Sequence, residues 1–394
     1  MAVVGKVYSL VKNVATALTG TKGGMFPNDV HIHEAMNWLV RAQKKTGNNG
    51  VSEGYHLYHG WLPSYPETTG YIIETFCHYA ERTANEQFRD SAIKMAEWLA
   101  SIQNSDGSIP DSYFRKKMVF DTGQVIFGFV RIFEETGNKK YKDAAVKAAD
   151  WIITQQEQDG SWIRHAAHNI PHTYYSRVAW SLLEAHRIAS RDQYAECCVK
   201  NIDWCLRNQL SNGWFENASF NLKNHHRPFT HTIAYTIRGI LESGIALQEK
   251  KYIDAARNAL DQLAKGIAGN GFVPGTFDRD WTGDERFSCL TGSAQLSISY
   301  FKLARLLKSE EYSRIGSVIN GYLKSKQNIR TRNLNIRGAT AGSYPLWGDY
   351  IHFTYPNWAT KFFVDALLQE DLIAQEGLPV PNRPGRRETY SAIP

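Results

Sequence analysis

Hydrophobic and polar positions along the chain divide into two kinds of helical segment, and residues 141–189 contain one of each. Tyr141, Ala145 and Ile152 recur at helical spacing while charged residues occupy the opposite side, which predicts an amphipathic helix with one wet face. From about Tyr175 the chain is apolar on nearly every side. This second segment predicts a helix that is buried all round.

The same pair of segments recurs along the chain, and its marker residues repeat every 53 to 60 residues. Each amphipathic segment begins with an aromatic residue, carries another large residue ten positions later, and is followed after nine more by a glycine. Asp or Asn precedes that glycine, which favours a turn with a left-handed backbone. The markers are Phe88 with Trp98, Tyr141 with Trp151, Tyr194 with Trp204, Tyr252 with Gln262 and Tyr312 with Tyr322, and the glycines are Gly107, Gly160, Gly213 and Gly271. Trp38 with Gly50 marks a first copy at longer spacing, and the copy at Tyr322 lacks the glycine at that distance.

Six such units fill residues 29 to about 370, and their second segments carry far less charge than their first segments. Helical pairs of this kind stack as an open solenoid or close into a ring. Closure is favoured, because an open solenoid would leave the apolar segments only partly covered. The sequence therefore predicts an all-α protein, an (α/α)6 toroid whose apolar helices form the inner ring.

The repeats define one domain at residues 29–370, with an N-terminal extension at 1–28 and an extended C-terminal tail at 371–394. With 394 residues and 43% hydrophobic content, the chain can bury one large core. The N-terminal extension lacks the continuous apolar run of a secretory signal. A packing or surface helix is expected there, with a membrane-surface helix as the alternative.

Charge and cysteine content narrow the functional classes. The net charge of +6 and the pI near 8.9 permit an acidic ligand, but no nucleic-acid recognition motif is present, so no nucleic-acid partner is expected. No apolar run reaches about 18 residues, so no integral membrane segment is predicted. Five cysteines without paired spacing indicate reduced thiols and a cytoplasmic protein. A homo-oligomer is left open.

In a closed ring, the connections from first to second segment all emerge on one rim, where the N-termini of the inner helices converge. Free N–H groups and positive dipole ends at such termini favour anionic or hydroxyl-rich ligands. These connections are long and rich in aromatic and ionisable residues, whereas the opposite ones, such as EETGN and ASRD, are short. We call the rim with the long connections the decorated rim and the opposite one the plain rim. We expect the functional site on the decorated rim.

Aromatic faces beside charged groups are typical of sugar recognition, because the rings stack on C–H groups and the charged groups bind hydroxyls and carboxylates. An oligosaccharide or polysaccharide, expected to be acidic, is the predicted substrate. The residues predicted to contact it are Tyr65, Trp162, Trp214, Arg227, Arg286, Trp347 and Tyr355. For Trp162 the alternative is that its indole plugs the ring.

The motifs QEQDGSW at 156–162 and QNSDGSIP at 103–110, with helix openings such as DTGQVIFGF and PETTGYII, resemble those of bacterial six-hairpin proteins that act on glycans. The resemblance covers all six repeats. It is specific for architecture rather than for reaction, since glycoside hydrolases, uronate lyases, sugar epimerases and terpene cyclases share this toroid. It is greatest for proteins associated with bacterial polysaccharide production, which implies a glycan substrate.

Glycoside hydrolysis needs two carboxyl groups about 5 to 10 Å apart, and neighbouring inner-helix ends, about 8 to 10 Å apart, can supply them. Glu67 precedes a Thr-Thr-Gly triplet and Asp121 precedes Thr-Gly, so both are predicted at the entrance to inner helices. Asp284, in DRDWTGDERF, is a third candidate. The alternatives are an N-cap role for Asp121 and a solvated, ion-paired loop around Asp284.

A second mechanism is elimination or C5 epimerisation of a uronate, which needs a base, an acid and a group that neutralises the carboxylate. His172, Tyr175, His231 and Arg227 are the candidates for these roles. A third class is a toroid that binds a polysaccharide, or a partner in an assembly complex, without catalysis. Metal-binding motifs and the Asp-rich motif of terpene cyclases are missing, so no metal and no cofactor are predicted. Hydrolysis is the preferred prediction.

Overall fold

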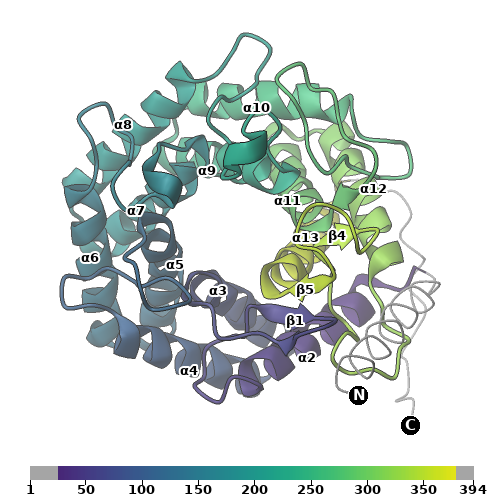
Figure 1. The fold of residues 1–394 in the computed structure, drawn as a ribbon, viewed down its shortest axis with the longest axis horizontal. Coiled ribbons are helices and arrows are strands. Elements are labelled where there is room, and N and C mark those ends of the chain that lie inside the picture. The colour runs from purple at the N-terminus through teal and green to yellow at the C-terminus, as the bar shows by residue number, and fades with distance from the viewer. Residues whose placement is uncertain (1–24, 379–394) are drawn as a thin grey trace.

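The structure, a computed structural model, describes residues 25–378, and in them twelve long helices form two concentric rings (Figure 1). The inner ring consists of α3 (Pro66–Thr83), α5 (Val119–Thr136), α7 (Ser176–Ala189), α9 (Thr230–Leu247), α11 (Leu290–Leu307) and α13 (Asn357–Gln375). The outer ring consists of α2 (Asn28–Lys44), α4 (Glu86–Ile102), α6 (Lys139–Thr154), α8 (Asp192–Arg207), α10 (Lys250–Ala264) and α12 (Glu310–Lys326). The predicted (α/α)6 toroid is confirmed.

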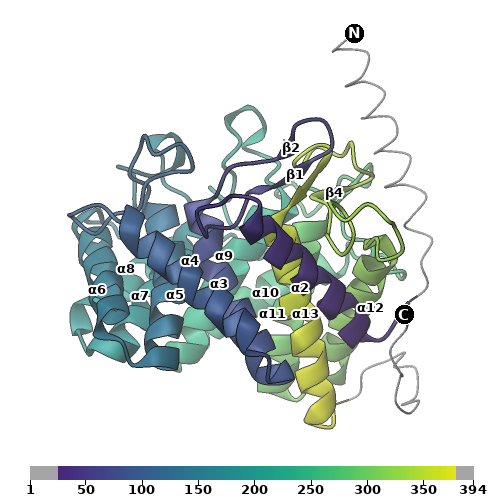
Figure 2. The same ribbon diagram turned by 90° about the horizontal axis from the view of Figure 1, so that it is seen from below.

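The strands and 3-10 turns of the described residues lie in the connections between helices. The strands are β1 (Gly54–His56), β2 (Gly60–Trp61), β3 (Ser288–Cys289), β4 (Ser343–Tyr344) and β5 (Thr354–Pro356), and the turns are η1 (Ala167–Asn169), η2 (Thr173–Tyr175) and η3 (Leu222–Asn224). β2, β1 and β5 form one antiparallel sheet, and β3 pairs with β4. Figure 2 shows β1, β2 and β4 on one rim of the ring.

The two rings differ in burial as the hydrophobic pattern predicts. Every residue of α9 from Thr230 to Gly244 is buried, whereas α10 buries one face only. The core therefore lies between the rings and within the inner ring. On the plain rim, inner helices end at residues with left-handed backbone, such as Ala84, Gly137 and Ser190, which allows an immediate turn into the next outer helix.

A glutamine at the end of an outer helix ties each of five outer helices to its neighbour. The side-chain amide of Gln156 donates to the carbonyl of Gly160 in its own turn, at 3.1 Å, and to Cys197 of α8, at 2.8 Å. The equivalent bridges come from Gln43, Gln103, Gln209 and Gln327, which reach α4, α6, α10 and α2 respectively. Because Gln327 reaches α2, the last outer helix is joined to the first.

The sixth repeat does contain a turn glycine, but later in the chain than the sequence spacing predicts. Gly338 has a φ of +87°, close to the +94° of Gly160. A Cβ at Gly338 would collide with the carbonyl of Glu34 in α2, as one at Gly160 would collide with Lys200 in α8. The connection after α12 is longer than the others, and this length displaces the glycine.

The first and last repeats close the ring directly. β1 and β5 pair with Gly54 opposite Pro356. The Asn357 amide, at the start of α13, donates to the carbonyl of Ser52 and to the hydroxyl of Thr68 on α3, both at 2.8 Å. Within residues 25–378 the helices therefore form a closed ring and not an open superhelix.

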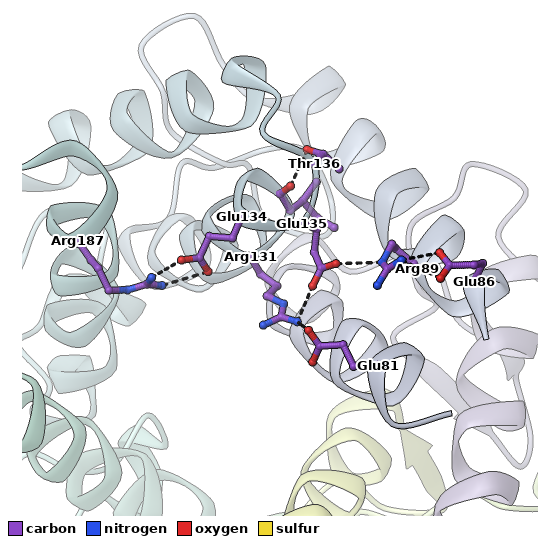
Figure 3. A network of polar contacts seen from close by, with 9 residues as sticks. Glu81, Glu86, Arg89, Arg131, Glu134, Glu135, Thr136 and Arg187 are labelled. Carbon is purple, nitrogen blue, oxygen red and sulfur yellow. Dashed lines mark hydrogen bonds and ion pairs between the residues drawn. The ribbon is translucent and has the colours of Figure 1, made fainter. Parts of the chain in front are cut away.

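Ion pairs join the C-terminal ends of neighbouring inner helices (Figure 3). Arg131 of α5 pairs with Glu81 of α3, and Arg187 of α7 pairs with Glu134 of α5. Lys302 joins α11 to Glu242 of α9 at 3.1 Å, and Arg82 joins α3 to Asp371 of α13 at 2.8 Å. The Arg187–Glu134 pair is exposed and contributes little stability, whereas Glu242 and Asp371 are buried and paired with partly buried cations.

The predicted domain limits differ slightly from the helices observed. α13 continues to Gln375, past the predicted domain end at residue 370. The predicted N-terminal extension up to residue 24 and the tail from residue 379 lie outside the described residues. Across residues 25–378, no helix is both long and apolar enough to cross a bilayer.

Candidate active site

The first two turns of α3 and α5 lie against each other at the decorated rim. A Cβ added to Gly70 would lie only 2.6 Å from the Cα of Val125, so the two backbones meet where only glycine fits. Glu67 and Asp121 sit in these first turns, at the second residue of α3 and the third residue of α5. Asp121 is therefore not an N-cap, because α5 begins before it and Met118 occupies the cap position.

The threonine of each Thr-Gly motif fixes the connection that precedes the helix. The hydroxyl of Thr69 accepts from the N–H of Val51 at 3.0 Å and donates to the carbonyl of Tyr65 at 2.7 Å. Thr122 does the same with Ile109 N–H, at 2.9 Å, and with the Met118 carbonyl. The backbone around both carboxyl groups is thereby preorganised.

Glu67 and Asp121 form a buried and electrostatically coupled pair, with exposed fractions of 8% and 5%. Burial raises the pKa of Glu67 to about 7, against the opposing effects of a hydrogen bond from Tyr65 and the cation of Arg177. Burial, and next the charges of Glu67 and Asp111, raise the pKa of Asp121 well above its ordinary value. An anionic Glu67 therefore favours the protonated form of Asp121.

Arg177 on α7 is a fully buried cation held by aromatic rings. Its Nε donates to the Oε1 of Gln124 at 2.8 Å, and among the described residues no carboxylate forms an ion pair with it. Its Cζ lies 4.8 to 5.6 Å from the ring centroids of Tyr71, Phe127, Trp180, Tyr235 and Phe362. Such contacts stabilise a desolvated cation, and this cation in turn favours the ionised form of Glu67.

His231 lies in the first turn of α9, near the same cation. Its Nδ1 is 2.9 Å from the Nε2 of Gln295, and its ring centroid is 4.3 Å from that of Tyr235. Burial, and next the charge of Arg177, lower the pKa of His231 to about 3. At neutral pH this side chain is a neutral imidazole and a weak base.

Tyr65 lies beside the carboxyl pair, whereas Tyr175 and His172 are bound to the loop at Ala167. Tyr65 hydrogen-bonds Glu67 and lies edge-on to Trp358, with centroids 6.0 Å apart. The hydroxyl of Tyr175 accepts from the N–H of Ala167 at 2.9 Å, and the Nε2 of His172 contacts the Ala167 carbonyl at the same distance. The side chains of Tyr175 and His172 are both buried, and these contacts hold them against the loop at Ala167.

Asp284 lies on the rim and is not among the charges that raise the pKa values of Glu67 and Asp121. Its carboxylate binds Arg286 at 2.6 Å, and Arg286, chiefly by these hydrogen bonds, lowers its pKa. Arg227 binds Asp278 at 2.8 Å and the Thr282 carbonyl at 3.0 Å. This loop forms the ion pairs that were the alternative interpretation for Asp284, and its catalytic role stays a prediction.

The aromatic residues predicted to contact substrate divide by burial. Trp162 is 1% exposed and its Nε1 donates to the carbonyl of Ile152 at 3.1 Å, so it packs in the core and cannot contact a sugar. Tyr355 is likewise buried, in β5. Trp347 is 55% exposed on the rim, whereas Trp214 is buried, at 3% exposed, and borders an open cleft of about 550 Å³ there.

Sequence reasoning missed Arg177, Gln124 and Tyr235, which lie inside inner helices rather than in connections. Arg177 left one signal: it is a charged residue near the start of an otherwise apolar helix. A buried charge of this kind is expected to be functional or paired. Within the described residues, no three side chains of His, Cys, Asp or Glu gather in a way that could hold a metal ion.

Comparison with known proteins adds a family likeness to this geometry. The sequence profile of the beta-L-arabinofuranosidase GH127 catalytic domain matches residues 5–195, a stretch that contains both Glu67 and Asp121. This match supports a glycoside hydrolase. No curated protein matches the sequence.

Several solved structures share the fold at low sequence identity. An unsaturated glucuronyl hydrolase specific for heparin superposes with a TM-score of 0.71 at 13% identity, over 88% of this chain and 97% of the other. Cellobiose 2-epimerase from Bacillus thermoamylovorans gives 0.66 at 12%, over 86% and 99%. A glycosyl hydrolase family 88 protein from Bacteroides vulgatus gives 0.62 at 9%, over 87% and 99%. These likenesses establish the toroid architecture.

Proposed function

We propose that this protein hydrolyses a glycosidic bond with Glu67 and Asp121 as the acid and base pair. The observation that carries the proposal is that these two buried carboxyl groups lie in the first turns of adjoining inner helices, close enough for the charge of Glu67 to raise the pKa of Asp121. Glycosidases of both stereochemical classes need one protonated and one ionised carboxyl group beside the same bond. The GH127 match over residues 5–195 supports the same reaction class.

The surroundings of each carboxyl group assign the roles. Tyr65 and Arg177 both favour the ionised form of Glu67, while the neighbours that affect Asp121 most are the anions of Glu67 and Asp111. Asp121 therefore keeps the proton and acts as the general acid toward the leaving oxygen. Glu67 is the base or nucleophile on the sugar.

An acidic sugar is the proposed substrate unit at this pair, because a cationic loop adjoins Asp121. Asp111, whose charge acts on Asp121, accepts from the backbone N–H of Arg115 at 2.8 Å and so holds the loop tip. The tip presents Arg115, Lys116 and a Tyr113 that is 69% exposed. Cations and an exposed ring are suited to a uronate or sulfated sugar.

The groups that a uronate lyase or epimerase would need are less well placed. His231 has a pKa lowered to about 3, which makes it a weak base for removing a C5 proton. Arg227 is engaged by Asp278, and His172 and Tyr175 by Ala167. These contacts favour hydrolysis over elimination or epimerisation.

A panel of acidic and neutral oligosaccharides, incubated with the protein in heavy water, tests the proposal. New reducing ends would support hydrolysis. Absorbance of a new double bond would indicate elimination, and deuterium at C5 without cleavage would indicate epimerisation; either result alone would overturn the proposal. Binding without any reaction would instead favour a non-catalytic glycan-binding protein.

A cellular location and an oligomeric state complete the proposal. All five cysteines are buried and free of disulfides, which fits a reducing compartment, so a cytoplasmic location stays the proposal. Size-exclusion chromatography with light scattering distinguishes a monomer from a homo-oligomer.

A further inference from the structure

The decorated rim contains a concave surface, which we call the rim cleft. It has a volume of about 550 Å³, within the range of clefts that bind small organic ligands. Its walls come from the connections before α7, α9 and α11, and the residues that matter here are His172, Trp214, Asn217, Leu222, Asp278 and Asp280. His172 joins it to the carboxyl pair, since its ring centroid lies 4.7 Å from that of Tyr174, which lies 5.4 Å from that of Phe120, the residue before Asp121.

The walls of the rim cleft are held together by hydrogen bonds between connections. Thr173 N–H donates to the carbonyl of Asn217 at 3.1 Å, and the Thr173 hydroxyl donates to that of Glu216 at 3.0 Å. The Asn212 amide donates to the carbonyl of Arg279 at 2.8 Å, and the indole of Trp281 donates back to the Asn212 carbonyl at 2.9 Å. The cleft is therefore preformed, which lowers the entropic cost of binding.

The charges that line the rim cleft do not favour an anion. Asp278 is neutralised by Arg227 at 2.8 Å, and Glu216 faces Arg279 at 3.7 Å. Among the described residues, no Lys or Arg lies within ion-pair distance of Asp280, so the unbalanced charge of the lining, apart from the two imidazoles of His225 and His226, is negative. The side chain of Leu222 is 53% exposed and offers an apolar surface, the apolar plate, on which the C–H face of a sugar can pack.

We propose that the rim cleft binds uncharged sugar residues of an oligosaccharide whose reacting sugar lies at Glu67 and Asp121. The placement of the reacting sugar at Glu67 and Asp121 rests on the proposed function. The substrate is then a chain of at least three sugars, with its neutral part over the connections that precede α7, α9 and α11. Its acidic part lies on the side of Tyr113 and Arg115.

Binding to a protein that cannot turn over its substrate tests the rim cleft separately from catalysis. The probes are cellotetraose, maltotetraose, chitotetraose and a heparin-derived tetrasaccharide, offered to the Glu67→Gln/Asp121→Asn double variant. We expect at least one neutral tetrasaccharide to slow amide hydrogen exchange in residues 214–222 and 278–281, and to bind at least tenfold more tightly than its monosaccharide. No protection of these segments by any neutral probe would overturn the proposal.

Two substitutions in the lining sharpen the test. Leu222→Asp places a charge on the apolar plate and is expected to weaken neutral binding about tenfold, whereas Leu306→Asp, at an exposed leucine of α11 outside the cleft, leaves it unchanged. Asp280→Lys is expected to raise the affinity for the heparin tetrasaccharide about fivefold. Equal effects of the two leucine substitutions, or no response to Asp280→Lys, would contradict a cleft site for neutral sugar.

The two proposals fail in different ways. Protection of residues 214–222 without any cleavage by the wild-type protein would support the rim cleft and contradict the proposed hydrolysis. Cleavage that is insensitive to chain length and to Leu222→Asp would support the proposed hydrolysis and contradict the rim cleft.

Discussion

The guanidinium carbon of Arg177 lies 4.8 Å from the ring centroid of Tyr235, on the neighbouring inner helix. Together with four further rings, this contact allows a cation to stay fully buried without a carboxylate partner among the described residues. Because Arg177 is not neutralised by an ion pair, its charge can act on the groups around it. It favours the ionised form of Glu67 and the neutral form of His231.

Arg177→Met is expected to move the acidic limb of the pH–activity profile upward by about one unit, because Glu67 then loses a cation that favours its ionised form. Arg177→Lys keeps a charge but not the planar group, so a smaller shift is expected. Initial rates between pH 4 and pH 10 measure this. The matched control is Arg187→Met, on the same helix and 52% exposed at its side chain. An unshifted profile in Arg177→Met would show that this cation does not act on the pair.

Glu67→Gln is expected to stabilise the protein at pH 8 by about 1 to 3 kcal/mol and to have little effect at pH 4. Burial raises the pKa of Glu67 from 4.5 to about 7, so the folded state binds the proton more tightly than the unfolded state. Stability is therefore highest below the unfolded pKa and is lost as pH rises through the folded value. Glutamine carries no charge and removes this loss. Urea unfolding at both pH values measures it, with the exposed Glu157→Gln as control; equal stability of wild type and variant at pH 8 would contradict it.

Gln156→Ala is expected to destabilise the protein by about 1 to 3 kcal/mol, because its amide bridges the Gly160 and Cys197 carbonyls of successive repeats. Gln155→Ala is the matched control. That adjacent side chain is also half-buried but bonds only within its own helix end, to Trp151 and Thr154. Thermal and urea unfolding compare the two. Similar losses in both variants would argue that the bridge between repeats adds nothing.

Gly338→Ala is expected to cost more than Gly377→Ala, which separates backbone strain from lack of space. Both glycines have positive φ, +87° and +78°, and an alanine there is strained by about 1 kcal/mol or more. A Cβ at Gly338 would also collide with the Glu34 carbonyl, whereas one at Gly377 meets nothing within 4 Å. Urea unfolding of both variants measures the difference. Equal destabilisation would mean that α2 shifts at little cost to make room for the methyl group, and that the contact at Gly338 does not hold the ring closed.

Asp284→Asn is expected to lower activity by less than about threefold, since its carboxylate binds Arg286 on the rim rather than joining the carboxyl pair. The rate of reducing-end formation measures this. A loss comparable to that of a catalytic carboxylate, about a hundredfold or more, would support a catalytic role for Asp284.

The architecture was predictable because its cause is periodic. Apolar residues at helical spacing, with Gly160 and its equivalents at fixed intervals, specify both the helices and their turns. The displaced Gly338 was not predictable, since a longer connection preserves the three-dimensional position of a turn and not its sequence spacing. The bridges from Gln156 and its equivalents were visible as repeated letters, but their bonding partners lie in the next repeat.

The candidate site was predictable only in part, because residue type does not report burial. Glu67 and Asp121 were placed by their positions before the Thr-Gly motifs, and the structure puts them together. Trp162 looks the same in sequence as an exposed stacking residue, yet its indole packs in the core. Arg177 lies inside an apolar helix, where only the folded ring reveals its aromatic neighbours.

The most direct test of the account is the rate of reducing-end formation by Glu67→Gln and by Asp121→Asn, on whichever oligosaccharide of the panel the wild-type protein cleaves. Each variant is expected to lose about a hundredfold to ten-thousandfold in kcat while remaining folded. A wild-type rate in either variant would contradict the assignment of this buried pair as the acid and base of the reaction.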